Sequence, residues 1–164
     1  MKINFFRILL FVLMACPFVS LSGQSASSSI TAVDLKADNR INPLGIDRFP
    51  VMLSWRMEAD VEALPGVAQV AYQIVAARSR ADLLAEKYSW DTGGVASSRT
   101  HQIPYAGPLP ERGERVWWRV RIEDATAGVS EWSEPAWFEA GLLDDSGWGD
   151  AEWISTTRNY QARE

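Results

Sequence analysis

One stretch of strictly alternating side chains, residues 115–123, limits what this chain can fold into more than any other feature of the sequence. One set of alternate positions holds Val116, Trp118, Val120 and Ile122, and the other holds Arg115, Trp117, Arg119, Arg121 and Glu123. Successive side chains on a β-strand point to opposite faces, so the alternation is typical of a strand with one face in a core and the other in water. The stretch therefore predicts a half-buried β-strand.

Shorter β-rich segments, separated by turn residues, predict the other strands. They cover residues 30–36, 52–58, 70–76, 88–91, 99–104 and 132–138. The side chains expected to face inward are Leu53, Trp55, Met57, Val70, Tyr72 and Ile74. His101 and Ile103 are expected to share one face of segment 99–104. Pro135 has no N–H for a sheet ladder, so it marks segment 132–138 as an edge strand.

Residues 80–86 have helical propensity instead, and Ser79 is placed to act as the N-cap of about two helical turns. About seven short strands within roughly 110 residues, with turns every 8–12 residues, are typical of a β-sandwich. The sequence therefore predicts an all-β, immunoglobulin- or fibronectin type III-like β-sandwich over residues 30–140, with one short helical insertion.

The beginning of the chain has the pattern of a secretory signal peptide. Positively charged residues precede an apolar run at 8–15, and this run is shorter than a transmembrane helix requires. We expect cleavage before Gln24, which gives a signal peptide over residues 1–23, followed by a flexible linker over 24–29. The less favoured alternative is a lipobox that makes Cys16 a lipid anchor. Either route predicts an exported protein, periplasmic or secreted, without a transmembrane span after signal removal.

Composition argues against several classes of function. The net charge is −5, without the clustered basic excess that nucleic-acid binding needs. The single cysteine, Cys16, lies in the leader, and the single histidine is His101. A disulfide in the mature domain and a zinc site with several His or Cys ligands are therefore excluded. We expect neither a cofactor nor a metal.

Four residues on or beside the alternating strand are candidates for a ladder of stacked side chains or for an interaction surface. They are Trp117, Arg119, Arg121 and Trp132. Their arrangement resembles the W-S-x-W-S motif of cytokine-receptor fibronectin domains, in which arginines interleave with tryptophans. A guanidinium over an indole ring contributes about 0.5–2 kcal/mol. We favour a structural ladder; the alternative is a sugar-stacking platform.

The end of the chain, residues 141–164, combines apolar side chains with aspartate, glycine and serine. Burying one large apolar side chain is worth roughly 1.5–3 kcal/mol, which a free tail would forgo several times. The segment is therefore expected to fold back on the sandwich or to lead into a further β-domain. Trp148 and Trp153 in this segment, together with Trp90 in a turn-rich region, are candidate docking residues.

Several motifs, in order and spacing, resemble the start of bacterial α-L-rhamnosidases. They are N-P-L-G-I-D at 42–47, L-S-W-R at 53–56, A-Y-Q-I-V-A at 71–76, W-D-T-G at 90–93, Y-A-G-P-L at 105–109, W-W-R-V at 117–120, S-E-W-S-E-P-A-W-F-E at 130–139 and A-E-W-I at 151–154. The resemblance covers the first module of that family, a fibronectin type III-like domain. It implies a non-catalytic module of a secreted glycoside hydrolase that packs against and orients later domains in cis or as a split product.

The resemblance carries over no catalytic residue, because the family's sugar chemistry takes place in a later (α/α)₆ barrel. Glycoside hydrolysis needs two carboxylates flanking the bond. The close acidic pairs at 144–145 and at Asp150 and Glu152 are interpreted as a solvated linker, and His101 has no nucleophile at motif spacing. We expect the chain alone to be inactive. The alternative is a free-standing exported module that binds a glycan or a protein.

Overall fold

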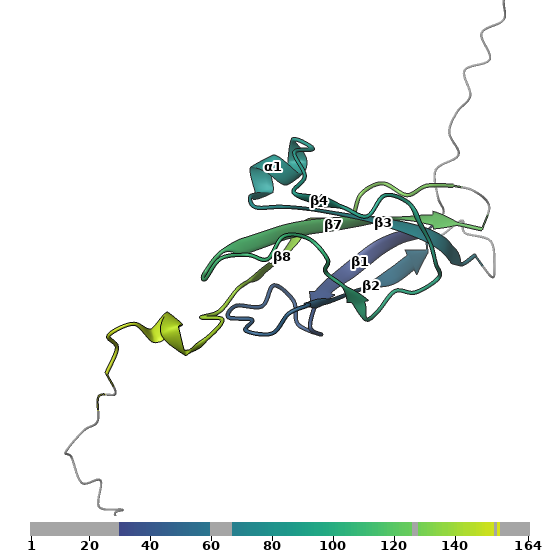
Figure 1. Ribbon diagram of the computed structural model, residues 1–164. Helices are drawn as coiled ribbons and strands as arrows, with labels where there is room; N and C mark the ends of the chain where they lie inside the picture. Colours follow the sequence, from purple (N-terminus) through teal and green to yellow (C-terminus); the bar gives the residue numbers. More distant parts are fainter. Residues whose placement is uncertain (1–29, 60–66, 126–127, 153, 155–164) are drawn as a thin grey trace, which may run out of the picture.

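The computed structural model describes residues 30–59, 67–125, 128–152 and 154. Within them, two antiparallel β-sheets pack face to face, and a short helix lies on the outer side of the larger sheet (Figure 1). The predicted signal peptide and linker, including Cys16, lie outside the described residues, as do Trp153 and residues 155–164.

The smaller sheet has the strand order β1–β2–β6. Its strands are β1 (Ile30–Ala37), β2 (Met52–Ala59) and β6 (Ile103–Pro104). In β2, Leu53 pairs with Ala37 on one side and with Ile103 on the other.

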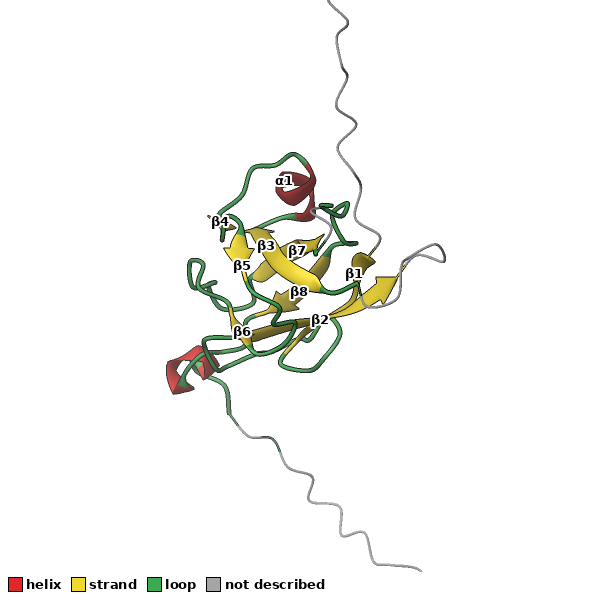
Figure 2. Cartoon of the chain, turned by 90° about the vertical axis from the view of Figure 1, so that its right-hand side faces the viewer, coloured by secondary structure: helices red, strands yellow, loops and turns green. Residues whose placement is uncertain are grey.

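The larger sheet has the order β4–β3–β7–β8, and β5 pairs with β3 beyond the end of β4. Its strands are β3 (Gln69–Ala77), β4 (Trp90–Asp91), β5 (Val95–Ala96), β7 (Arg115–Asp124) and β8 (Ala136–Glu139). Helix α1 (Arg80–Leu84) lies above this sheet in Figure 2, and the 3₁₀ helix η1 (Asp145–Trp148) follows β8. The predicted all-β sandwich with one helical insertion is confirmed.

The core lies between the two sheets. Trp118 and Phe138 from the larger sheet and Leu53 from the smaller one are completely buried. Trp55 packs edge to face on Tyr72, with 5.2 Å between the ring centroids. The inward orientation predicted for these side chains of β2 and β3 is therefore correct.

Three predicted orientations are wrong, each because the strand departs from simple alternation or passes beyond the core. The register of β3 shifts between Gln69 and Ala71, so Gln69 is buried and Val70 is exposed. Met57 is 38% exposed, since the end of β2 passes beyond the core. His101 is exposed while Ile103 is buried, because Gln102 between them has a positive φ of 52°.

The predicted strand over 132–138 is shorter than expected, because β8 begins at Ala136, just after Pro135. Before it, two serines pair with β7 through both backbone and side chain. Ser130 N donates to Ile122 O (2.8 Å), Ile122 N to Ser130 Oγ (3.0 Å), Ser133 N to Val120 O (2.9 Å) and Val120 N to Ser133 Oγ (3.1 Å). The serine hydroxyls thus accept the hydrogen bonds from the β7 N–H groups that the carbonyls of a neighbouring strand would accept in a regular ladder.

Gln69 connects three parts of the sandwich from a position that is 2% exposed. Its Oε1 accepts from Trp55 Nε1 (3.0 Å), and its Nε2 donates to the carbonyls of Ser97 (2.9 Å) and Arg99 (3.0 Å). The amide therefore satisfies the buried indole N–H and ties segment 97–99 to the two sheets.

Gln69→Ala is expected to lower the free energy of unfolding by about 2–4 kcal/mol, because it leaves the buried Trp55 N–H and two carbonyls without partners. Urea unfolding followed by tryptophan fluorescence measures the change. Ser98→Ala, at an exposed position of the same segment, is the control and should alter stability by less than about 0.5 kcal/mol. Equal effects of the two variants would contradict the role assigned to Gln69.

Candidate functional site

The outer face of the larger sheet carries a second apolar cluster. Val75 and Ala77 from β3 pack there against Leu83 of α1. Ser79 caps the helix, since its Oγ accepts from the Asp82 N–H (3.0 Å), as the sequence predicts. The helix is shorter than the two turns expected, but it covers part of the face that simple alternation assigns to water.

Trp132 lies at the centre of a group of cationic and aromatic side chains on this face. The guanidinium carbons of Arg119 and Arg121 each lie 4.7 Å from the centroid of its ring. Tyr88 packs beside Trp132, with 6.4 Å between the two ring centroids. The Tyr88 hydroxyl accepts a hydrogen bond from Arg119 Nη2 (2.8 Å). Of the four predicted ladder residues, the structure brings Arg119, Arg121 and Trp132 together.

Trp117, the fourth predicted residue, takes a different partner. Its ring lies 6.3 Å from that of Trp137 on β8, and Arg115 lies 4.2 Å over Trp137. Arg115 Nε also pairs with Glu139 at 2.7 Å. Strand alternation places Trp137 opposite Phe138 and so signals an outer-face position, but no sequence signal marks Tyr88, which comes from the loop after α1.

Arg119 departs from the prediction that its whole face of β7 is solvated, since it is 8% exposed. Its nearest carboxylate, on Glu86, is 3.9 Å away, and Arg119 Nε has no hydrogen-bond partner among the described residues. A buried guanidinium with few charged partners depends on stacking and on the Tyr88 hydroxyl for compensation. The arrangement is thus suited to a structural ladder.

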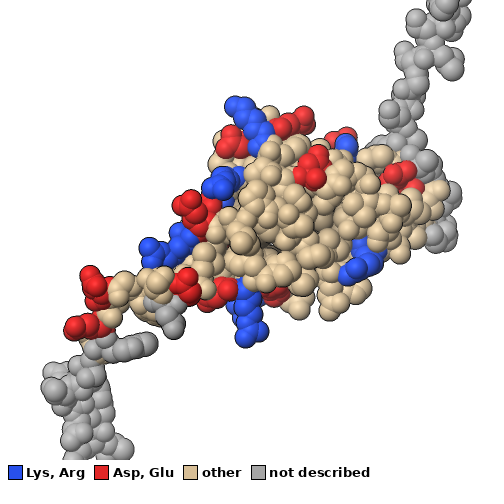
Figure 3. All heavy atoms as spheres, in the orientation of Figure 1, with Lys and Arg blue, Asp and Glu red and all other residues tan. Residues whose placement is uncertain are grey.

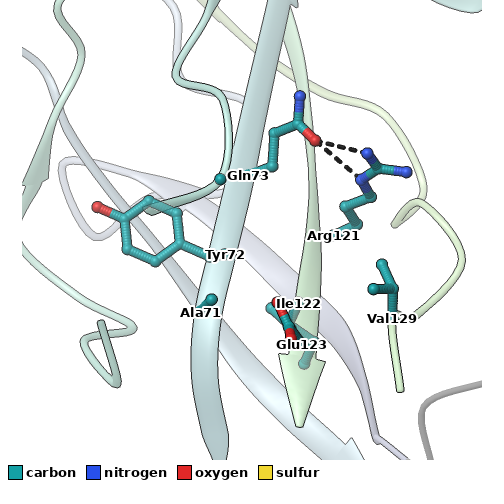
Figure 4. Close-up of a pocket in the computed structure, with 8 residues that line it drawn as sticks. Ala71, Tyr72, Gln73, Arg121, Ile122, Glu123 and Val129 are labelled. Atoms are coloured by element: carbon teal, nitrogen blue, oxygen red, sulfur yellow. Dashed lines mark hydrogen bonds between the residues drawn. The ribbon is translucent and has the colours of Figure 1, made fainter. Parts of the chain in front are cut away.

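A groove of about 200 Å³ lies beside Arg121 on the same outer face, across β3 and β7 (Figure 4). Its lining residues are Ala71, Tyr72, Gln73, Gly94, Arg121, Ile122, Glu123 and Val129. At one end, Gln73 Oε1 accepts from Arg121 Nε (2.9 Å) and Nη2 (2.7 Å), as the dashed lines in Figure 4 show. Gln73 Nε2 in turn donates to Asp91 Oδ1 (2.7 Å). No sequence pattern predicts this groove, because it depends on the register of β3 against β7.

Trp90, which the sequence marks as a candidate docking residue in a turn-rich region, is half-buried. Its ring packs edge to face on Tyr105 (4.9 Å), which packs likewise on Phe138 (5.3 Å). Tyr105 is 4% exposed, and its hydroxyl donates to the carbonyl of Pro108 (3.0 Å). Burial raises the pKa of Tyr105 to about 12. Trp90 therefore closes the edge of the core.

The chain leaves the sandwich through an exit clamp, in which residues 42–47 lie alongside residues 137–143. Ile46 and Ala140 form a parallel bridge. The hydrogen bonds run from Trp137 N to Asn42 Oδ1 (3.0 Å), Glu139 N to Pro43 O (3.0 Å), Ile46 N to Glu139 O (2.9 Å), Gly141 N to Ile46 O (2.8 Å) and Leu143 N to Asp47 Oδ1 (3.4 Å). The direction of the chain is therefore set as far as residue 143.

Beyond the exit clamp, η1 remains attached to the sandwich through Arg112, whose Nη1 donates to Gly147 O (2.6 Å). Asp144 caps η1, and hydrogen bonds from Ser146 lower the pKa of the Asp144 carboxyl. Trp148 in η1 is 56% exposed. Figure 3 shows positive and negative side chains next to one another around the rim of the visible face, with a broad uncharged area between them.

None of the residues considered for catalysis lines the groove across β3 and β7. His101 is exposed, and Asp144, Asp150 and Glu152 are exposed on the segment after β8. No three His, Cys, Asp or Glu side chains in the described residues are grouped so that they could hold a metal ion. In the same part of the chain, every helix is too short or too polar to cross a membrane.

Residues 32–144 match the family described as Rha78A-like, N-terminal immunoglobulin domain. An α-L-rhamnosidase of Streptomyces avermitilis is 45% identical over 113 residues, which are 69% of this chain and 10% of that protein. An α-L-rhamnosidase of Formosa agariphila is 31% identical over 166 residues, which are 100% of this chain and 17% of that protein. This chain thus spans a small part of the relatives that it matches.

Solved structures show the same fold. The crystal structure of Streptomyces avermitilis α-L-rhamnosidase complexed with L-rhamnose matches with a TM-score of 0.67 and 39% identity, over 73% of this chain and 11% of that chain. The α-L-rhamnosidase from Dictyoglumus thermophilum matches with a TM-score of 0.67 and 32% identity, over 73% and 13%.

The two packed antiparallel sheets and the family match define an immunoglobulin-like β-sandwich domain. More particularly, the chain belongs to the family of Rha78A-like N-terminal immunoglobulin domains. The resemblance to the first module of α-L-rhamnosidases is confirmed.

Arg119→Ala is expected to lower the free energy of unfolding by about 1–3 kcal/mol, because stacking on Trp132 and the bond to Tyr88 are both lost. Thermal and urea unfolding measure this, with the exposed Arg40→Ala as control. Arg119→Met retains the aliphatic stem and should recover much of the loss, since it removes a buried charge. Unchanged stability of Arg119→Ala would exclude a structural ladder.

Tyr105 should make stability depend on pH in the alkaline range. Its pKa is about 12 in the folded chain and about 10 when unfolded, so its contribution is complete below about pH 10 and is lost as the pH rises through about 12. The difference in tyrosinate absorbance between the wild type and Tyr105→Phe should titrate near pH 12. A difference that titrates near pH 10 would contradict the burial of this phenol.

Proposed function

We propose that this chain is the non-catalytic N-terminal β-sandwich module of a secreted α-L-rhamnosidase-like glycoside hydrolase, and that it packs against and orients the domains that follow. Its similarity to short stretches of much longer α-L-rhamnosidases supports this role. The scattered, exposed acidic side chains after β8 also suit a connection better than a catalytic pair, which has to be held at a defined separation.

The exit clamp is the observation that carries the orienting role. A free linker leaves a domain in any direction, whereas residues 137–143 are held by backbone and side-chain hydrogen bonds to residues 42–47. A domain attached after this segment would inherit its direction from the sandwich. Since the clamp continues from β8, that direction is coupled to the larger sheet.

Gly141 supports the same argument, because the exit clamp leaves no space for a side chain there. A Cβ at this position would overlap the Asp47 side chain and lie 3.1 Å from the carbonyl carbon of Gly45. The Asp47 carboxylate accepts from Leu143 N, so displacing it would release the following residue as well. Close packing at this point makes the exit rigid.

In this proposal, residues 30–140 form the sandwich and residues 141–164 connect it to a further β-domain. Trp148 is the docking residue that the described part of this connection offers, with 56% of its surface exposed for a contact. Trp153 has the same proposed role. The signal-peptide pattern of residues 1–23 supports the proposal that the module is exported, with lipidation at Cys16 as the alternative to cleavage before Gln24.

Gly141→Ala tests the orienting role. Hydrogen exchange should show protected amides at Ile46, Gly141 and Leu143 in the wild type, and protection at least about tenfold lower in the variant. Gly94→Ala is the matched control, since a Cβ there meets nothing within 4 Å. Exchange of these amides at the unfolded rate in the wild type would exclude an orienting clamp.

An activity assay tests the non-catalytic part of the same proposal. The chain should not hydrolyse 4-nitrophenyl α-L-rhamnopyranoside above the rate of the buffer alone. Turnover that survives purification of the folded chain would contradict a purely accessory role.

A further inference from the structure

We propose that the groove across β3 and β7 binds one neutral pyranose unit of a glycan. This site is separate from the exit clamp and does not depend on the orienting role. The proposal rests on the shape of the groove, on polar side chains that the fold holds in place, and on hydrogen-bonding groups that remain available within it.

The shape of the groove follows from small side chains on a wide sheet. Ala71 on β3 forms a low floor, and Gly94 beyond β3 adds no side chain at that edge. Val129 adds an apolar wall beside β7, as Figure 4 shows. A volume of about 200 Å³ is smaller than that of a typical drug-sized pocket, so it suits a single ring.

The polar end of the groove is fixed before any ligand arrives. Asp91 accepts from Gln73 Nε2, which leaves Gln73 Oε1 directed at Arg121 Nε and Nη2. The guanidinium also lies over Trp132. A side chain held by both stacking and paired hydrogen bonds loses little conformational freedom when it binds a ligand.

Two groups in the groove retain hydrogen-bonding capacity. Among the described residues, Arg121 Nη1 and the Glu123 carboxylate take no part in a hydrogen bond or ion pair. Arg121 Nη1 is a donor and the Glu123 carboxylate is an acceptor. A sugar hydroxyl can both accept and donate, so neighbouring hydroxyls of one ring can bind to the two groups. The groove is lined by one cationic side chain, Arg121, and one anionic side chain, Glu123, so its charges balance and it favours a neutral ring over an anionic one.

The test is a titration of the chain with blocked monosaccharides, followed by amide chemical shifts. The panel contains the methyl pyranosides of glucose, mannose, galactose and rhamnose, with D-glucuronate as the anionic arm. At least one neutral pyranoside should give saturable shifts at β3, β7 and residues 94 and 129, with a Kd of about 1–10 mM. Glucuronate should bind at least about threefold more weakly.

Two variants decide whether the groove is responsible. Ala71→Leu fills the floor from the outer face and should weaken binding at least about tenfold, while Glu123→Gln removes the charged acceptor and should weaken it about fivefold. Glu134→Gln, an exposed carboxylate outside the groove, is the control. The dispersion of the amide chemical shifts and thermal unfolding check that each variant is folded. If Ala71→Leu does not fold, Glu123→Gln alone decides whether the groove is responsible for binding.

Three results would overturn the proposal. The first is the absence of saturable shifts from the whole neutral panel at about 100 mM. The second is a set of shifts centred away from the groove, for example on Trp148. The third is tighter binding of glucuronate than of every neutral pyranoside, which would make the groove an anion site built on Arg121.

Discussion

The arrangement of a large part of this domain depends on the pairing of two serines with β7. Ser130 and Ser133 accept hydrogen bonds from the N–H groups of Ile122 and Val120, where a regular strand would present carbonyls. Trp132 lies between them in sequence and is thereby placed over Arg119 and Arg121. The same segment leads into β8, which continues into the exit clamp. One set of hydrogen bonds thus links the ladder, the groove and the exit.

Two buried polar side chains stabilise the sandwich in different ways. Gln69 has partners for both ends of its amide, so its burial leaves none of that group unsatisfied. Arg119 keeps an unpartnered Nε among the described residues and relies on aromatic rings and one hydroxyl. The first arrangement joins the two sheets, whereas the second joins the larger sheet to the loop after α1.

Much of the fold could be predicted from local pattern alone. Alternation in residues 115–123 identified β7, and Ser79 identified the start of α1. Errors arose at Val70, where a register shift interrupts alternation, and at His101, where the positive φ of Gln102 does the same. A periodic pattern contains no information on a single residue that breaks the period.

The sequence by itself determined the β-sandwich, its helical insertion and its family, because strand period, turn residues and motif order are local properties of the chain. Only the tertiary structure decided that Arg119 is buried, that Trp117 pairs with Trp137, and that Gln73, Arg121 and Glu123 border one groove. These outcomes depend on which strands become neighbours and in what register. The contacts that set that register join residues far apart in sequence, so no local pattern contains them.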